Sequence, residues 1–445
     1  MFLPDYVLKA VDILNKNGYK AYPVGGCVRN HLMGILPDDY DMTTNATPEE
    51  MLVAFKGYSS FDAGLKHGTL SVIIDSQVIE ITTHRIESTY TDNRHPDGVI
   101  FTRQLELDLG RRDFTMNAIA YEPMTKAYHD PYMGIGDIRN SLIRSVGDAK
   151  ARFEEDALRI LRALRFSSVL GFSIEQKTSD AIHSCKHLLE KISPERIYTE
   201  FTKLICGSNA ASVLREYSDV IEVFIPEIRP MIGFDQHNIH HCYDVYEHTL
   251  ATLDAIEPEP LLRWTMLLHD IGKPETFFTD ERGGHFYGHY KNSTDIAVRV
   301  LTRLRASNNT IDRVKTLIYH HDSVIPESTK SVRRLISKLG YDTLTDLFKV
   351  NRADAKGQAP HQLKERIEHI DRLENIAEEL MQGVECFDIK HMMIKGNDLI
   401  SLGIPKGKRI GKILAILFDE LTEEKLTNTK EALMKRALEL KDTDI

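Results

Sequence analysis

The pattern of the chain changes near residue 148, and this change limits the folds open to it. Up to that point, helical periodicity over residues 6–17 alternates with β-branched runs at 70–74 and 78–83, separated by a predicted hairpin turn at 75–77. Beyond it, amphipathic helical patterns dominate, as over 154–169, 197–205 and 261–269. The sequence therefore predicts an α+β chain: an N-terminal head with a mixed or antiparallel sheet, followed by all-helical parts.

The length of 445 residues argues for several domains, because single hydrophobic cores stop growing at about 250–300 residues. No apolar run approaches the ~20 residues of a membrane span, and the N-terminus lacks the features of a secretory signal, so we expect a cytoplasmic protein. The formal net charge of −10 disfavours non-specific coating of nucleic acid. Any contact with RNA must therefore come from a local basic surface.

The first candidate site lies in the N-terminal part. Gly25 and Gly26 follow an apolar strand, where glycine lets the backbone approach a triphosphate closely, and Arg29 can neutralise the charge. Asp39 and Asp41 follow. Two acids at this spacing on a strand point to the same face, about 7 Å apart, which suits hard cations such as Mg²⁺. A solvated turn would also produce either feature alone.

A third acid, Glu80, interrupts an otherwise apolar strand pattern. A carboxylate at a core-like position is costly unless a cation or hydrogen bonds satisfy it. With Asp39 and Asp41 it fits a two-metal site, in which one ion activates an attacking 3′-hydroxyl and the other holds the leaving pyrophosphate.

Three multi-residue motifs occur in order: GGCVRN (25–30) with DYD (39–41), RRDFTMNA (111–118) and EDALRILRALRF (155–166). Together they resemble the class II tRNA nucleotidyltransferase and bacterial poly(A) polymerase family, closely over about residues 20–230 and more loosely beyond. The resemblance implies a head of the DNA polymerase beta type that uses Mg²⁺. It further implies CCA addition to the 3′ end of tRNA from CTP and ATP, without a nucleic-acid template.

Two positions depart from the family pattern. Asn30 stands where an aspartate usually follows GGxVR, and because Asp39 and Asp41 are intact we expect only indirect consequences. His84 stands where the family more often has an aromatic residue, and the sequence offers no interpretation of this change.

The third motif would choose the base. Spacing alone also fits a salt-bridged, solvated helix face. The resemblance implies instead that Asp156 accepts a hydrogen bond from the exocyclic amino group of cytosine or adenine, while Arg159 donates to ring acceptors. Guanine and uracil cannot satisfy this pair. Arg162 and Arg165, with Arg112 from the second motif, would hold phosphates or orient the pair.

The polar segment 87–98 has the length of a functional lid. Members of the resembled family that add only CC have a shortened loop here. The intact loop therefore favours full CCA addition over CC-only addition.

The helical part carries an ordered set of histidines and aspartates that resembles an HD-type metal phosphohydrolase, including the motif LHDIGKP (268–274). Such ligands on separate helices are typical of a metal site in a helical bundle, and Mn²⁺, Ni²⁺, Co²⁺ or Fe would fit them. A site that keeps the fold without turnover remains the alternative. The candidate ligands are His248, His269, Asp270, His289, His320, His321 and Asp354.

A basic, glycine-bearing segment near the C-terminus precedes a helical pattern and is typical of a phosphate-binding surface, although a solvated loop remains open. The resemblance implies that it holds the acceptor arm of tRNA. The candidate residues are Lys395, Lys406, Lys408, Arg409 and Lys412.

These features predict four domains: a nucleotidyltransferase head (1–147), a helical neck with the templating residues (148–230), an HD domain (231–358) and a helical tRNA-binding region (359–445). One alternative is a bacterial poly(A) polymerase, which the absence of a basic run over 431–445 disfavours. An A-adding or CC-adding enzyme is another. The last is an RNA-end phosphohydrolase that acts through the HD domain.

Overall fold

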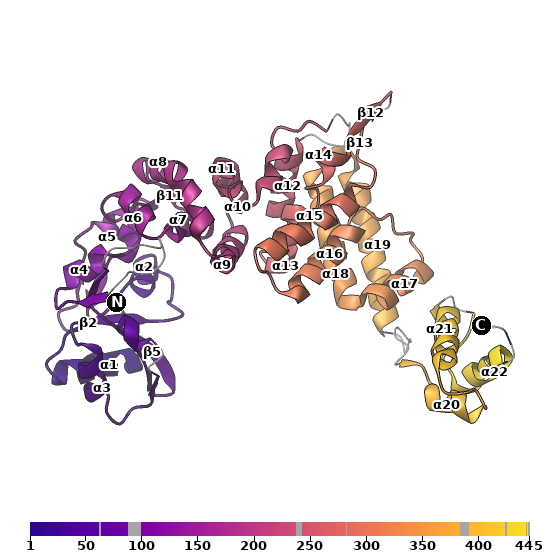
Figure 1. The fold of residues 1–445 in the computed structure, drawn as a ribbon, viewed down its shortest axis with the longest axis horizontal. Helices are drawn as coiled ribbons and strands as arrows, with labels where there is room; N and C mark the ends of the chain where they lie inside the picture. The colour runs from indigo at the N-terminus through magenta and orange to yellow at the C-terminus, as the bar shows by residue number, and fades with distance from the viewer. Residues whose placement is uncertain are drawn as a thin grey trace. The chain divides into compact units, whose positions relative to one another are not determined.

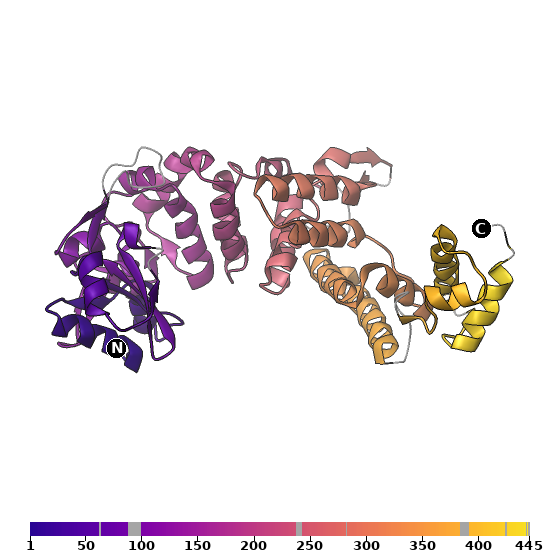
Figure 2. The ribbon, with the colours of Figure 1, turned by 60° about the horizontal axis from the view of Figure 1, so that its bottom comes forward.

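The computed structural model describes residues 1–61, 64–87, 99–236, 243–281, 283–382, 391–422, 425–441 and 443. The chain divides into two compact units (Figures 1 and 2). The first unit is Met1–Pro226 with Arg303–Arg305, and the second is Glu227–Thr302 with Ala306–Ile445. Among the described residues, no helix is both long and apolar enough to cross a membrane. The finer division into four domains stays a prediction.

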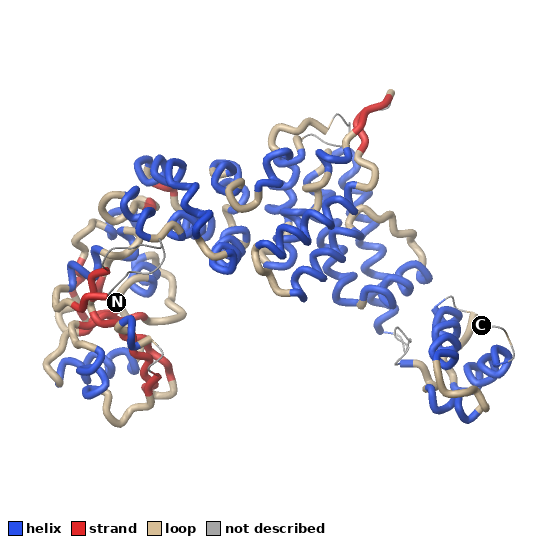
Figure 3. Tube along the Cα trace, viewed as in Figure 1, coloured by secondary structure: helices blue, strands red, loops and turns tan. Residues whose placement is uncertain are grey.

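The head is built on a five-stranded mixed sheet (Figure 3). β2 and β5 run parallel, and all other neighbours are antiparallel. Asp75 and Ser76 form the turn between β4 and β5 with φ values of 50° and 62°, as in a type I′ hairpin, so the predicted antiparallel hairpin is confirmed. The sheet order is β1 (Ala21–Pro23), β2 (Asp41–Thr44), β5 (Gln77–Thr83), β4 (Thr69–Ile74) and β3 (Ser60–Phe61).

One face of this sheet forms the core of the head. Alternate residues of β4 and β5, such as Leu70 and Ile81, are buried and face α1 (Asp5–Lys16) and α3 (Pro48–Ala54). α1 contributes an apolar stripe that includes Val7 and Leu14. Because side chains alternate along a strand, the residues between the buried ones, Asp41 and Glu80 among them, reach the opposite face.

The rest of the first unit is mostly helical. Residues 154–169, predicted as one helix, form two helices that break at Asp156, whose backbone is extended (φ −140°, ψ 102°). The elements are α2 (Gly26–Leu32), β6 (Arg85–Glu87), β7 (Val99–Phe101), α4 (Leu105–Gly110), β8 (Ala120–Glu122), β9 (Ala127–His129), α5 (Gly134–Arg139), β10 (Leu142–Ile143), α6 (Ala149–Glu155), α7 (Leu158–Leu170), β11 (Ser173–Ile174), α8 (Gln176–Cys185), α9 (Pro194–Ile205), α10 (Ala210–Glu216) and α11 (Ser218–Ile221), with 3₁₀ turns at Leu65–His67, Thr115–Asn117 and Lys186–Lys191. A further 3₁₀ turn, Pro226–Met231, spans the start of the second unit.

The second unit is a set of packed helices with a short antiparallel hairpin, β12–β13. α18 packs against α12 and α19. The elements are α12 (Val245–Ala255), α13 (Pro260–Leu268), α14 (Lys273–Thr276), β12 (Phe278–Asp280), β13 (Gly283–His285), α15 (His289–Arg303), α16 (Asn308–His320), α17 (Thr329–Leu339), α18 (Tyr341–Gly357), a 3₁₀ turn at Pro360–Gln362, α19 (Leu363–Gln382), α20 (Gly396–Ser401), α21 (Lys408–Thr422) and α22 (Lys430–Lys441).

α5 holds the second motif in place. Asp130 caps the start of this helix by accepting hydrogen bonds from the N–H groups of Gly134 and Ile135 (2.6 and 2.9 Å). Within α5, Asp137 accepts from the hydroxyl of Thr115 at 2.7 Å. The backbones approach so closely that a Cβ on Gly134 would overlap the carbonyl oxygen of Thr115.

Gly134→Ala should therefore lower the free energy of unfolding of the first unit by about 1–3 kcal/mol or more, because the backbone contact cannot relax without moving the motif. Gly136→Ala is the matched control, since its Cβ would meet nothing within 4 Å and should raise stability by at most about 1 kcal/mol. Urea unfolding of both full-length variants measures the difference. Equal stabilities would contradict the close packing of α5.

Candidate functional site

The three predicted acids of the head lie near one another at the open face of the sheet. In the parallel pairing of β2 with β5, Asp41 stands directly opposite Glu80. Asp39 lies two residues before Asp41, in the loop that leads into β2. Although Asp41 reaches solvent, the surrounding protein displaces part of its water and raises its pKa; Asp39 and Glu80 raise the pKa further, and Arg112 opposes them.

The predicted core-like position of Glu80 is wrong. The residue is not at a core-like position, because it is exposed while Ile79 and Ile81 on either side are buried. Its relevance comes from the strand register, which sets it beside Asp41. This pairing of distant strands is not visible in the spacing of the sequence.

Gly25 begins the turn between β1 and α2 with φ 76°. Its N–H donates to the carbonyl of Ile119 (3.3 Å), and a Cβ here would lie 3.1 Å from the guanidinium of Arg112. Arg112 in turn pairs with the fully buried Asp108 (3.5 Å). The glycine is thus required by its positive φ and by the close approach of Arg112. Gly26 follows as the first residue of α2.

Three predicted arginines meet around the ring of Phe166, which is buried near the middle of α7. The Cζ atoms of Arg29, Arg162 and Arg165 lie 5.1, 5.5 and 4.2 Å from the ring centroid, within the range of cation–π contacts. Burial lowers the pKa of Arg29 and of Arg165, and the neighbouring arginines lower both further, although Asp113 opposes this at each of them. A multiply charged anion would relieve this repulsion.

Each arginine is held by a polar partner. Arg29 donates to the side-chain oxygens of Asn30 (2.8 Å) and Asn117 (2.8 Å). Asn30, the departure from the family pattern, therefore positions Arg29 without a negative charge. Arg165 pairs with the buried Glu200 of α9 (3.1 Å), a residue that the sequence analysis did not single out.

Asp113 is the partner of Arg162. Its side chain is 9% exposed and accepts from Nε and Nη2 of Arg162 at 2.9 and 2.7 Å. It also accepts from Asn117 and from the N–H of Phe114 (3.1 and 2.8 Å). Burial alone would raise the pKa of Asp113, but Arg162 and these hydrogen bonds lower it to about 2. Asp113 therefore ties the second motif of the head to α7.

The two predicted templating residues lie close in sequence but hold different protein partners. Asp156 accepts from the N–H of Leu158 (3.1 Å) and from Arg196 of α9 (3.0 Å). Arg159 is buried and donates to Glu155 at 2.7 Å. Arg196 was not predicted. The signal available was its place in the polar stretch SPER that opens α9 (193–196).

The structure gives His84 a place that the sequence could not. It is buried beside Tyr22, with ring centroids 6.1 Å apart and planes 24° from parallel. Burial lowers its pKa, so the ring is neutral and packs as an aromatic residue would. The adjoining loop prediction falls mostly outside the described residues, which omit 88–98.

Four predicted histidines of the second unit point their Nε2 atoms toward one another. Each has its other nitrogen, Nδ1, within 3.0 Å of a backbone carbonyl oxygen. Since a carbonyl only accepts, Nδ1 carries a proton, and a neutral ring therefore presents a lone pair at Nε2. The four are His248, His269, His289 and His321.

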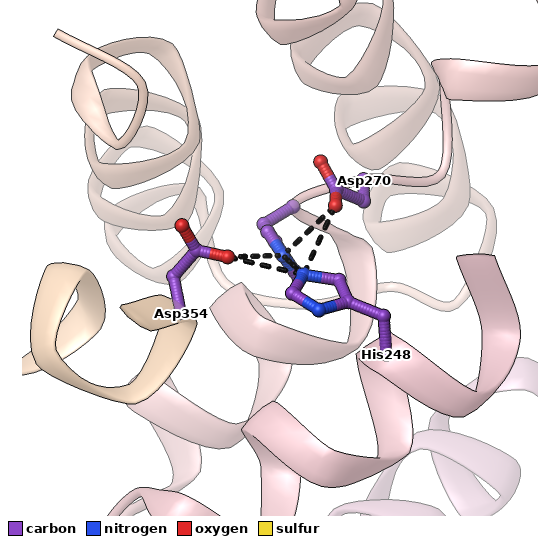
Figure 4. A group of neighbouring side chains, drawn as sticks. His248, Asp270 and Asp354 are labelled. Atoms are coloured by element: carbon purple, nitrogen blue, oxygen red, sulfur yellow. Dashed lines mark hydrogen bonds and ion pairs between the residues drawn. The ribbon is translucent and has the colours of Figure 1, made fainter. Parts of the chain in front are cut away.

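The Nε2 atoms come in two close pairs, His248 with His269 at 3.2 Å and His289 with His321 at 3.3 Å. Two facing lone pairs repel unless a cation lies near both. Asp270 has ligand atoms within reach of both pairs, and Asp354 joins the first (Figure 4). The two potential metal-binding groups, His248–His269–Asp270–Asp354 and Asp270–His289–His321, therefore share Asp270.

The carboxylates of this cluster, Asp270 and Asp354, favour a nearby cation. Both oxygens of the buried Asp270 lack a hydrogen bond among the described residues, although Lys273 forms an ion pair at 2.7 Å. Burial alone would lower the pKa of His269, but Asp270 and Asp354 raise it to about 10, so its ring carries a positive charge unless a bound cation takes the place of the proton on Nε2. Nitrogen and oxygen donors in this number suit divalent transition metals. The residues present therefore fit the predicted metal.

His320 is the one predicted ligand that the structure does not bring into the cluster. Consecutive residues at the end of a helix point about 100° apart, so only one of His320 and His321 can face the site. His320 lies near Lys338, and burial together with that lysine lowers its pKa.

The predicted RNA-binding residues near the C-terminus do not behave alike. Lys395, Lys406, Lys408 and Lys412 are exposed around the starts of α20 and α21. Arg409 instead donates to the carbonyl oxygens of Lys441 and Thr443 (2.6 and 2.7 Å), and so anchors the end of the chain.

Comparison with known proteins places the chain in a family. A model of the poly A polymerase head domain matches residues 21–144, one of the probable RNA- and SrmB-binding site of polymerase A matches 171–232, and one of a putative tRNA nucleotidyltransferase domain 2 matches 288–437. The CCA-adding enzyme of Ligilactobacillus salivarius is 33% identical over 98% of both chains. The chain belongs to the CCA-adding enzyme family.

Further relatives agree with this placement. The CCA-adding enzyme of Enterococcus faecalis is 33% identical over 95% of this chain and 93% of that one. A crystal structure of the Bacillus stearothermophilus CCA-adding enzyme in complex with CTP is 27% identical and superposes with a TM-score of 0.73 over 98% of both chains. The predicted family and fold class, with the mixed sheet in the head and helices beyond, are confirmed. The HD assignment stays a prediction.

The acid dependence of stability tests the role of Asp113. Its pKa is about 2 in the folded protein and ordinarily 3.8, so its stabilisation is complete above about pH 4 and is lost as the pH falls toward 2. Asp113→Asn should lower the free energy of unfolding at pH 7 by about 3–5 kcal/mol, because Arg162 keeps its charge without a partner.

Urea unfolding of the wild type and the variant between pH 7 and pH 2.5 measures this effect, and the difference should shrink at the acid end. Asp12→Asn is the control, since it removes only the exposed ion pair with Lys16 and should change stability little at any pH. A constant difference across the range would contradict the ionised, buried state of Asp113.

Proposed function

We propose that this chain adds CCA to the 3′ end of tRNA, using CTP and ATP without a nucleic-acid template. The observation that carries the proposal is the register of Asp41 opposite Glu80, with Asp39 beside them, at the open face of the sheet. Membership of the CCA-adding family supports the substrates. tRNA, CTP and ATP are therefore the expected partners.

The acids fit a pair of Mg²⁺ ions. Asp39 and Asp41 would hold them with Glu80 as the third ligand, since the neighbouring carboxylates already raise the pKa of Asp41 and a cation would relieve their repulsion. When bound, such ions supply electrostatic stabilisation of the attacking and leaving oxygens of a phosphoryl transfer. The protein supplies the geometry, because the parallel pairing of β2 with β5 keeps Asp41 and Glu80 adjacent.

The arginines around Phe166 are suited to hold the triphosphate. Arg29, Arg162 and Arg165 are already ordered by Asn30, Asp113 and Glu200, so little conformational entropy is lost when an anion binds. Arg112, packed on Gly25, extends this positive surface toward Asp41.

Asp156 and Arg159 would read the base. A carboxylate that accepts from an amino group and a guanidinium that donates to ring acceptors fit cytosine and adenine but not guanine or uracil. In this structure Arg196 and Glu155 occupy part of their hydrogen-bonding capacity. A base would therefore compete with these partners at both residues.

Nucleotide addition tests the assignment directly. The protein is incubated with Mg²⁺ and a tRNA transcript that ends at the discriminator base, with each nucleotide alone and with CTP and ATP together. We expect products that stop at three added nucleotides only when both are present. Asp39→Ala and Asp41→Ala should each reduce the rate at least about 10³-fold, because a metal-ligating carboxylate is lost.

The same gel separates the alternatives. A ladder of A from ATP alone would indicate a poly(A) polymerase, and a stop at two nucleotides a CC-adding enzyme. Addition that survives Asp39→Ala would refute the metal site. Asp12→Asn is the matched control and should leave addition unchanged. Asp12 is an exposed acid of α1 that pairs with Lys16 and is not among the three acids of the proposed metal site.

A second proposal concerns the cluster of the second unit, which we infer to be an HD-type site for two divalent metals among Mn²⁺, Ni²⁺, Co²⁺ and Fe. The facing Nε2 pairs and the shared Asp270 support it. Such ions, when bound, polarise a phosphate ester toward hydrolysis. The chain would then act on RNA ends as a phosphohydrolase as well.

Metal content tests this site. His269→Ala should lose bound Mn²⁺ or Ni²⁺ in equilibrium dialysis followed by elemental analysis, because one Nε2 of the first pair is removed. His320→Ala is the matched control and should keep the wild-type content, since the ring lies outside the cluster. Equal metal content in both variants would exclude the cluster as the site.

The exposed Lys395, Lys406, Lys408 and Lys412 would contact the acceptor arm of tRNA, whereas Arg409 would order the tail around them. The domain boundaries at 147, 230 and 358 and the cytoplasmic location remain predictions from the sequence.

A further inference from the structure

Asp108 of α4 is a fully buried carboxylate that accepts from four donors of the head. Two are guanidinium groups: Nε of Arg111 lies at 2.9 Å and Nη2 of Arg112 at 3.5 Å. The others are the hydroxyl of Thr43 at 3.1 Å and the backbone N–H of Arg85 at 3.3 Å. A buried carboxylate is costly unless such donors satisfy it. Asp108 therefore joins β2, β6 and the second motif at one point.

The two arginines depend unequally on this carboxylate. Burial alone would raise the pKa of Asp108, but Arg111 and Arg112 lower it below its usual value, so the carboxylate is ionised and balances both. The contact with Arg111 has the length of an ordinary hydrogen bond, whereas the contact with Arg112 is long. Asp108 thus holds Arg112 loosely, through charge more than through close geometry.

Arg112 has little else to hold it. Asp108 is its one side-chain hydrogen-bond partner among the described residues, and its Nε is buried without a partner there. Its Nη1 lies 3.1 Å from the place that a Cβ on Gly25 would take. The side chain is still 20% exposed, so a bound anion can reach it. A guanidinium in this state can turn to another carboxylate if the charge of Asp108 is removed.

Asp41 is a second carboxylate beside Arg112. The N–H of Val24, the residue before Gly25, donates to the carbonyl oxygen of Asp41 at 3.0 Å, so Arg112 stands next to the start of β2. The charge of Arg112 also opposes the rise in the pKa of Asp41. A guanidinium that paired directly with Asp41 would occupy the oxygens that a cation needs.

We propose that Asp108 is a positioning residue that keeps Arg112 off the acids of the metal site, so that Asp41 stays open to Mg²⁺ and Arg112 to the triphosphate. The inference rests on the proposed metal site at Asp39, Asp41 and Glu80. It adds a residue that touches neither metal nor substrate and acts through Arg112.

The Mg²⁺ requirement tests this role in two ways: the rate of CTP addition to a tRNA transcript, and calorimetric Mg²⁺ binding to the full chain with CTP but without RNA. Asp108→Asn keeps the shape of the side chain and loses the charge that holds Arg112. The half-saturating Mg²⁺ concentration should rise about 10-fold in both measurements, as expected when a hydrogen bond between charged groups must be displaced. Excess Mg²⁺ should restore most of the rate.

Asp137→Asn is the matched control. Asp137 is also a buried acid of the head, but it pairs with Arg144 and not with Arg112. Its replacement should leave the half-saturating Mg²⁺ concentration unchanged in both measurements. The histidine–aspartate cluster of the second unit is the same in every variant, so any Mg²⁺ bound there cancels in the comparison.

A double variant shows whether the effect passes through Arg112. Asp108→Asn/Arg112→Gln should need the same Mg²⁺ as Arg112→Gln alone, since no guanidinium is left to compete. An unshifted requirement in Asp108→Asn, or a raised one that persists in the double variant, would overturn the inference. Arg112→Gln alone should need as much Mg²⁺ as the wild type. A clearly lower need would overturn the inference even if Asp108→Asn did not fold, because Arg112 would then compete with Asp108 in place.

Asp39→Ala in the same assay tests the metal site itself. Addition that survives this change, or wild-type addition that does not depend on Mg²⁺, would overturn the metal site and this inference together. A wild type that depends on Mg²⁺, with an unshifted requirement in Asp108→Asn, would overturn the inference alone.

Discussion

The ion pair between Asp113 and Arg162 is the interaction on which the arrangement of the first unit depends. Asp113 belongs to the head and Arg162 to α7, so their contact fixes the helix of the third motif against the second. Through Asn117 the same network reaches Arg29. Without a buried carboxylate at its base, three guanidinium groups would not gather around Phe166, because their mutual repulsion would separate them.

The sequence was informative where chemistry depends on local spacing. The glycine pair, the two acids of DYD and the hairpin turn at Asp75 could all be predicted, because each depends on residues within a few positions of one another. The relation between Asp41 and Glu80 could not be, because it depends on which strands pair and in what register. Glu80 was singled out because its position was predicted to be buried. The residue is exposed, and it is relevant because it stands opposite Asp41.

Contacts between residues far apart in the sequence could not be predicted either. The helix break at Asp156 is hidden because the apolar periodicity continues across it, and Arg196 and Glu200 act from a different helix. The histidine cluster was easier to predict. In His269, His289 and His321, Nδ1 donates to the carbonyl oxygen three residues earlier, near a helix end. For His269 and His321 that carbonyl lies in the last turn of a helix, where it has no intrahelical partner, so the orientation of these two rings is largely set by local structure; for His289 it belongs to Phe286, just before α15. The same reasoning separates His321 from His320 only once the end of α16 is known.

In the proposed reading of the base, the partners now held by Asp156 and Arg159 would have a kinetic consequence. Exchanging the ion pair with Arg196 or Glu155 for a hydrogen bond to a neutral base would offset part of the free energy of base binding, because charge-assisted hydrogen bonds are the stronger ones. A base read in this way is discriminated by the mismatch of wrong donors and acceptors, yet the correct base is not held tightly. A polymerase must release each added nucleotide before it can read the next. Because the base is held weakly, Asp156 and Arg159 can return to Arg196 and Glu155 after each addition.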